Sequence, residues 1–286
     1  MAIRQLRTSN PSMSHRKIPA LRGLLWCLEA ARQLKVAPQP IFSMAIWLSL
    51  GMLLPGLNFF MLILITVFYG GAISALHKKA QGAQAGLGDF FNGFKSLPRF
   101  LSLFMTGLPT ILFAIFSSSV LVQALGPDVA QTLAQPGQTP SPELIEKIAP
   151  VLLGAILKLL PAAIVVGWIV FLAVPRSILD GRLGFLALWD ALRAIMGNIG
   201  ALCLFSLGML LTVIAASFLL AIPMALIGNA GALAPLLQTF VLVFISTLAW
   251  AWYLNAMYIA WRDIFMTDTG IAVSEPENAD KAQIEI

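Results

Sequence analysis

Residues 41 to 76 read IFSMAIWLSLGMLLPGLNFFMLILITVFYGGAISAL, thirty-six residues without one charged side chain. As a single helix this stretch would be about 54 Å long, whereas the hydrocarbon core of a bilayer is about 30 Å thick. The stretch must therefore fold back. Residues 54 to 58, Leu-Pro-Gly-Leu-Asn, supply the reversal, because proline lacks an amide donor, glycine accepts a positive φ and asparagine caps a following helix. We expect two short spans here, with a re-entrant hairpin as the alternative.

Similar apolar stretches recur along the whole chain. Of its 286 residues, 59% are hydrophobic and only 11% are charged, a composition outside the range of water-soluble domains. Charge is avoided in such stretches because one unpaired charge at the bilayer centre costs about 2.5 to 3.5 kcal/mol. The pattern predicts an all-α, polytopic membrane helix bundle with six transmembrane helices, at about residues 41–57, 59–76, 100–125, 151–175, 199–222 and 233–260. Together these six stretches contain a single charged residue, Lys158.

The distribution of lysine and arginine predicts the orientation. Seven of these bases precede the first stretch, four lie in residues 77–99, three in 176–198 and two in the C-terminal tail. The remaining two are Lys147 and Lys158. Because cytoplasmic loops carry the excess of bases, we expect both termini to be cytoplasmic and residues 126–150 to be external.

The segments outside the predicted spans differ in kind. We expect residues 1–17 to be a disordered basic N-terminus, 18–265 the membrane domain, and 266–286 a disordered acidic tail. In the external loop, Ser141-Pro142-Glu143 has the form of a helix start and predicts a short helix on the outer surface. A second uncharged reversal is expected at residues 223 to 232.

Three amphipathic segments suggest an internal repeat, at residues 20–36, 87–97 and 183–197. Each has a bulky apolar residue followed four positions later by a base: Leu28 and Arg32, Phe91 and Lys95, Trp189 and Arg193. Residues four apart share a helix face, so the methylenes of the base can lie on lipid while its cation reaches phosphate. We therefore expect three hairpins, each preceded by a cytoplasmic interfacial helix whose base contacts lipid headgroups. The alternative is that any helix entering a membrane from its basic side looks like this.

Other features of the spans have a functional and a structural interpretation. Lys158 can attract a lipid phosphate or anionic substrate, but it lies near enough to the span's end to extend to the outer interface, which favours a structural role. Ser117 to Ser119 can line a polar path, although such serines more often bond to their own helix. An aromatic and methionine face on the last span favours packing over a ligand cage: Trp250, Tyr253, Met257 and Trp261.

No motif for catalysis, metal binding or cofactor binding is present in the sequence. Only Cys27, Cys203, His15 and His77 offer thiol or imidazole groups, and they form no metal-ligand spacing. Nucleophile elbows, zinc-protease motifs and phosphate loops are absent. The net charge of +5 follows from bases flanking the spans and requires no nucleic-acid partner. We expect no cofactor, no metal and no enzymatic activity.

Residues 173–182, AVPRSILDGR, followed by 187–194, ALWDALRA, and by Asn198, resemble a family of uncharacterised bacterial six-span inner-membrane proteins. That family is related to the membrane domain of some glycerophosphodiester phosphodiesterases. Residues 90–95, FFNGFK, are similar to its first cytoplasmic loop. The chain departs from the family at Asp190, where a small hydroxyl residue is expected. The resemblance covers about residues 18 to 265, implies a multi-pass protein of the cell inner membrane, and carries over no catalytic residue or substrate.

These observations lead to two functional hypotheses. The first is an accessory or lipid-binding inner-membrane protein that supports envelope function, with anionic lipid and a protein partner or a second copy of the chain as partners. The alternative is a transporter or channel for a small neutral or lipid-like solute, although no acid lies in mid-span to drive transport with protons. A lipid-modifying enzyme would need acids grouped at one interface, and the sequence offers only the scattered Asp89, Asp180 and Asp190.

Overall fold

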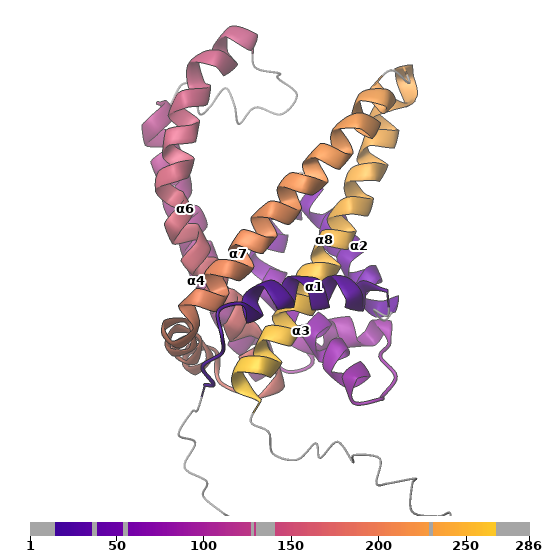
Figure 1. Ribbon diagram of the computed structural model, residues 1–286, viewed down its shortest axis with the longest axis vertical. Coiled ribbons are helices and arrows are strands. Elements are labelled where there is room, and N and C mark those ends of the chain that lie inside the picture. Colours follow the sequence, from indigo (N-terminus) through magenta and orange to yellow (C-terminus); the bar gives the residue numbers. More distant parts are fainter. Residues whose placement is uncertain are drawn as a thin grey trace, which may run out of the picture.

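The structure is a computed structural model of the chain, and it describes residues 15–35, 39–53, 57–126, 129, 141–228 and 231–266 (Figure 1). Within these ranges the regular elements are all helices. The α-helices are α1 (Arg22–Leu34), α2 (Gln39–Leu53), α3 (Leu57–Ala80), α4 (Leu97–Leu125), α6 (Pro142–Leu179), α7 (Gly184–Gly228) and α8 (Ala234–Phe265). Two 3₁₀ helices, η1 (Leu87–Phe94) and η2 (Gly231–Leu233), precede α4 and α8.

Five of these helices, α3, α4, α6, α7 and α8, are long and apolar enough to cross a membrane. The expected class, a helical multi-pass membrane protein, is therefore supported. The first expected span corresponds to α2, which has 15 residues and a length of about 22 Å. Because this is shorter than the hydrocarbon core, length and composition do not establish a sixth span. The expected reversal at residues 54 to 58 lies largely outside the described residues.

The long helices contact both their neighbours along the chain and more distant helices. The most extensive contacts join α4 to α6 and α6 to α7, and α2 packs against both α3 and α8, whereas α7 and α8 contact each other less. Figure 1 shows the α4–α6 pair and the α7–α8 pair close together at the lower end and apart at the upper end. None of the residues in the most apolar window of α7 is buried. The described core therefore lies mainly where the pairs converge, and α1 lies across α7 and α8 there.

The buried residues include two of the four residues of the aromatic face expected on the last span. Met257 and Trp261 are buried in α8, and Tyr253 lies 5.6 Å from Phe171 of α6 between ring centroids. Packing is confirmed for Met257 and Trp261, whereas Tyr253 also lines a cavity between α6, α7 and α8. The interpretation of the serine run is also confirmed, because the hydroxyls of residues 117 to 119 donate to carbonyls of their own helix, at Ala114 and Ile115.

Two expected helix boundaries are wrong. Ser141 does cap a helix, accepting a hydrogen bond from the amide of Leu144, but the expected short outer helix is the first part of α6, which runs unbroken to Leu179. Pro150 lies inside it, where a proline removes one hydrogen bond without ending the helix. Likewise, Pro223 lies inside α7, so the second reversal begins only after Gly228.

The three amphipathic segments take different helical forms. The first is α1, and the second is the 3₁₀ helix η1, which ends at Phe94 before α4 begins at Leu97. The third, residues 184–197, is the beginning of α7 and ends at a kink, where Asn198 has φ −132° and ψ 24°. The expected helix over 87–97 is thus shorter and more tightly wound than predicted.

Candidate functional site

Each acid on an amphipathic segment pairs with a base near the end of a long helix. These pairs are Asp89 with Lys78 of α3, Asp190 with Arg176 of α6, and Glu29 with Arg262 of α8. We call these six residues the polar collar. In the first two pairs the base lies on the long helix that comes just before the segment in the chain. In the third pair the base lies on α8, the last helix, and the acid lies on α1. The polar collar therefore closes a cycle through the three segments.

The ends of α3, α6 and α8 meet at Trp261. Its indole nitrogen donates to Asp180 at the end of α6, at 2.8 Å, and its ring stands edge-on to His77 of α3, with 5.7 Å between centroids. Residue 262, next along α8, is a member of the polar collar. Trp261 thus holds together the helix ends from which the collar's bases project.

Asp190 is the most enclosed acid of the collar, with 1% of its side chain exposed. Its Oδ2 accepts from Nε of Arg176 at 3.2 Å and from Nε of Arg182 at 3.1 Å. Its Oδ1 is buried without a hydrogen-bond partner in the described part of the chain, beside a cavity of about 10 Å³ that His15 and Arg193 also line. That space suits one water molecule.

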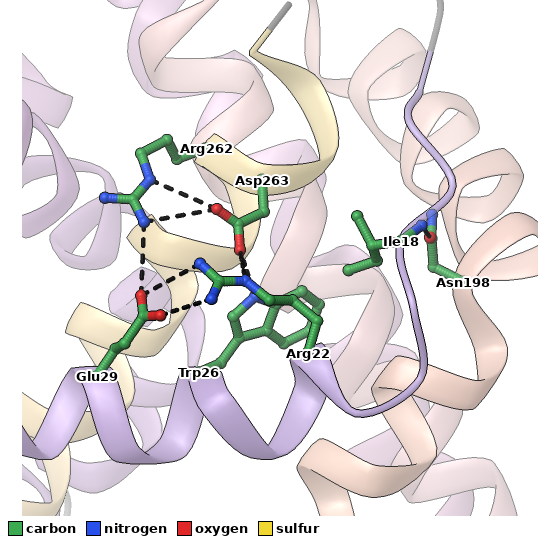
Figure 2. A network of polar contacts seen from close by, with 7 residues as sticks. All are labelled: Ile18, Arg22, Trp26, Glu29, Asn198, Arg262 and Asp263. Carbon is green, nitrogen blue, oxygen red and sulfur yellow. Dashed lines mark hydrogen bonds and ion pairs between the residues drawn. The ribbon is translucent and has the colours of Figure 1, made fainter. Parts of the chain in front are cut away.

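A second network fixes α1 to the end of α8 (Figure 2). Arg22 donates to Asp263 at 2.6 Å and to Glu29 at 2.6 Å, and the indole nitrogen of Trp26 donates to Asp263 at 2.9 Å. The hydrogen bond to Asp263 is the main cause that raises the pKa of the Arg22 guanidinium above its ordinary value. Since Trp26 is fully buried, α1 is anchored by packing as well as by charge.

The kink in α7 holds the chain that leads into α1. Asn198 accepts from the amide of Ile18 at 2.8 Å and donates to the carbonyl of Arg16 at 3.1 Å (Figure 2 shows Ile18 and Asn198). The amide of Arg16 in turn donates to the carbonyl of Ile264 in α8, at 2.8 Å. Residues 15 to 17 belong to the expected disordered N-terminus, yet Arg16 is bonded on both sides. Residues 1–14 and 267–286, the rest of the two expected disordered ends, lie outside the described residues.

Asp89 organises the second amphipathic segment. Its carboxylate accepts hydrogen bonds from Lys78, from the amide of Gly86 at 3.0 Å and from Asn92 at 3.1 Å. Burial alone would raise the pKa of Asp89, but these donors and the charge of Lys78 outweigh it and lower the pKa below its ordinary value. Asp89 is therefore held as a carboxylate.

The three bases expected at lipid headgroups all lie on the surface. Arg32, Lys95 and Arg193 are exposed, and none of them pairs with an acid in the described part of the chain. Arg193 lies over the ring of Trp189, with its guanidinium carbon 5.0 Å from the ring centroid. Lys158, the fourth expected contact, is exposed on α6, far from these three in sequence. What the four bases touch outside the protein stays a prediction.

The three segments agree in which positions they bury. The bulky residue before the acid or amide is about half exposed in each, at Leu28, Phe91 and Trp189. The residue two positions after the bulky residue is small and buried, and the base four positions after the bulky residue is exposed. The small residues are Ala30, Gly93 and Ala191. This shared pattern supports the repeat that the sequence suggests.

A cavity of about 120 Å³ lies between α6, α7 and α8, away from the polar collar. Its wall includes the indole of Trp168, whose nitrogen donates to the hydroxyl of Ser206 at 2.8 Å. The lining residues are Ile164, Gly167, Trp168, Phe171, Phe205, Ser206, Met209 and Tyr253.

Sequence reasoning found the exposed bases and missed both the pairing of the acids and this cavity. One signal for a contact between two spans was available in the sequence. Trp168 lies inside an expected span, where its N–H group needs a hydrogen-bond partner.

No three His, Cys, Asp or Glu side chains among the described residues come together as a possible metal site. Cys27 and Cys203 are both free thiols, the first buried and the second exposed. No family model matches the chain, and no curated protein or solved structure is significantly similar to it.

Proposed function

We propose that this protein is a non-enzymatic, multi-pass protein of the cell inner membrane that binds anionic lipid through its amphipathic segments. The observation that carries the proposal is the repeated surface made by Arg32, Lys95 and Arg193, each with an exposed apolar residue four positions before it. The acids of the same segments pair with other bases, Lys78, Arg176 and Arg262, so they do not compete for these cations. A cation beside an exposed apolar side chain suits the boundary between phosphate and acyl chains.

The proposal includes the arrangement in the membrane. α2 would be a short sixth span, giving three hairpins that each follow an interfacial segment, with both termini cytoplasmic. Support comes from the excess of bases on the predicted cytoplasmic side. The resemblance to six-span inner-membrane proteins agrees with this arrangement. An accessory role beside a protein partner or a second copy of the chain is part of the same proposal.

The test is the selectivity of the purified protein for spin-labelled phosphatidylglycerol over spin-labelled phosphatidylcholine in reconstituted bilayers. Replacing Arg32, Lys95 and Arg193 together with glutamine should reduce this selectivity, since each base near an anionic surface contributes about 1 kcal/mol. The reduction should be larger at low salt, where screening is weaker. Lys147→Gln, which removes an exposed base from the predicted external side, is the control and should retain the selectivity. Unchanged selectivity in the triple variant would contradict the proposal.

A second candidate function is transport of a small neutral or lipid-like solute. The cavity between α6, α7 and α8 favours it, because its lining is mainly apolar and contains no charged side chain. Solute flux into proteoliposomes, absent from protein-free liposomes, would support transport over the accessory role.

A further inference from the structure

We propose that the cavity between α6, α7 and α8 binds one acyl chain of a bilayer lipid. This inference deepens the proposed lipid-binding function and rests on its placement of these helices in a membrane. The cavity would bind the hydrocarbon part of a lipid, whereas the exposed bases are proposed to bind the headgroup.

The size of the cavity suits part of a chain. Its volume of about 120 Å³ is close to that of an engineered apolar cavity of about 150 Å³ that binds benzene. Sites for whole drug-sized ligands are larger, about 300 to 1,000 Å³. A segment of an acyl chain fits this space, and a complete lipid does not.

The sequence leaves this space open at Gly167. A Cβ atom built on Gly167 would meet no atom within 4 Å, so no neighbouring group requires glycine there. Glycine inside a helix costs about 0.5 to 1 kcal/mol relative to alanine. An unfilled apolar cavity also loses dispersion contacts along its lining. A lipid chain would restore those contacts.

The hydrogen bond between Trp168 and Ser206 keeps α6 and α7 in place on either side of the cavity. The indole N–H donates its hydrogen bond to the serine oxygen. The indole can therefore face hydrocarbon without leaving a buried donor unpaired. Apolar and aromatic side chains make up most of the remaining lining, including Ile164, Phe171 and Met209. The wall therefore favours a neutral, apolar occupant.

The surroundings indicate that this occupant comes from the bilayer. Directly beyond Met209, α7 exposes Leu210, Leu211 and Val213, and its most apolar window contains no buried residue. α6 exposes Leu160 and Val165 beside the lining residue Ile164. The apolar lining thus continues into helix faces that the protein does not cover. Hydrocarbon chains are the apolar molecules that a bilayer presents to such faces.

The experiment uses the full chain in nanodiscs of phosphatidylcholine, a fraction of which carries a diazirine on one acyl chain. After irradiation, labelled peptides are quantified by mass spectrometry. In the native protein we expect labelling of the buried lining residues Trp168, Phe171 and Phe205, assigned residue by residue from the fragment spectra. Gly167→Leu fills the cavity and should lower this labelling about tenfold, as expected when the burial of about two methylene groups is lost.

Gly154→Leu is the matched control, because Gly154 lies on the same helix and a Cβ there also meets no atom within 4 Å. It does not line the cavity and should leave the labelling unchanged. Gly167→Ala, a smaller change, should give an intermediate loss with the helix intact. Equal labelling of native protein and Gly167→Leu, or equal loss in Gly154→Leu, would overturn the inference.

The neutral lipid separates this test from that of the proposed function. If the bases do not select anionic lipid, the diazirine result is unaffected, and an empty cavity leaves the headgroup result unaffected. Absence of labelling on every exposed helix face would contradict the membrane placement, and both proposals would then fail.

Discussion

Asp190 holds two arginines with a single carboxylate oxygen, and its side chain is almost fully enclosed. We predict that Asp190→Asn lowers the free energy of unfolding by about 2 kcal/mol, because it removes the charge of an enclosed carboxylate that accepts hydrogen bonds from two partly buried arginines. Reversible unfolding in mixed micelles measures this. Glu29→Gln is the control: its side chain is 28% exposed, and we expect a loss of about 1 kcal/mol or less. Equal stability of Asp190→Asn and the native protein would show that the pairing contributes little.

Asp89 gives a prediction about pH. Its folded-state pKa lies below that of the unfolded chain, so its contribution to stability is complete above the unfolded pKa and is lost as the pH falls through the folded pKa. The carboxyl ¹³C resonance of Asp89 should therefore titrate below the ordinary value of about 3.9. Lys78→Gln should move the midpoint upward, since it removes a donor and a positive charge. A midpoint at or above the ordinary value in the native protein would refute this.

At the residue scale, the sequence predicted which bases are exposed better than it predicted which bases the acids pair with. A base four positions after a bulky apolar residue is a local pattern, and Arg32, Lys95 and Arg193 are indeed exposed. The partners of the acids are set by how helices meet. Arg22 and Asp263, for example, are 241 positions apart, and no local pattern relates them.

Gly23 decides how closely the first amphipathic helix approaches α7. A Cβ at this position would lie 1.8 Å from the carbonyl oxygen of Ala201, too close for any side chain. We predict that Gly23→Ala moves α1 away from α7 and uncovers Cys27, whose burial in the native protein raises its thiol pKa to about 11. In a Cys203→Ser background, alkylation of Cys27 at pH 8 should be about tenfold faster or more, as its pKa returns toward about 8.5.

Gly88→Ala is the control for this measurement. Gly88 lies in η1, and a Cβ there meets nothing within 4 Å, so the rate at Cys27 should stay at the native value. An unchanged rate in Gly23→Ala would mean that α1 tolerates the side chain without moving.

At the scale of elements, hydropathy located the long helices and failed at their boundaries. α6 ends at Leu179, beyond the expected end of its span at residue 175, and the third amphipathic segment and the fifth expected span form one helix that is kinked at Asn198. Proline was weighted too strongly as a breaker at positions 150 and 223, although both lie within continuous helices. In an apolar helix the surrounding hydrogen bonds outweigh the one that proline removes.

The whole molecule has a predicted orientation that labelling can test. With both native cysteines replaced by serine, Gln138→Cys should react with an impermeant maleimide in intact cells, whereas Ser9→Cys and Ser274→Cys should react only after lysis. The reason is that sixteen of the eighteen lysines and arginines fall on the predicted cytoplasmic side. Reaction of Ser9→Cys or Ser274→Cys in intact cells would reverse the topology.

Composition alone predicted the class of the molecule, because a bilayer imposes the same apolar requirement on every span. It could not predict the separation of the α4–α6 and α7–α8 pairs at one end, since lipid-facing and helix-facing apolar residues read alike. The cavity beside Trp168 escaped for the same reason: its lining residues are ordinary members of apolar helices.

The bonds of α1 to α8 impose an order of events during synthesis. Arg22, Trp26 and Glu29 leave the ribosome long before Arg262 and Asp263, which are their partners in the finished fold. Until the last helix has been inserted, α1 can contact α7 but lacks its partners on α8. A chain that stops before α8 would keep the pair between Arg22 and Glu29 but would leave the indole N–H of Trp26 without the carboxylate of Asp263.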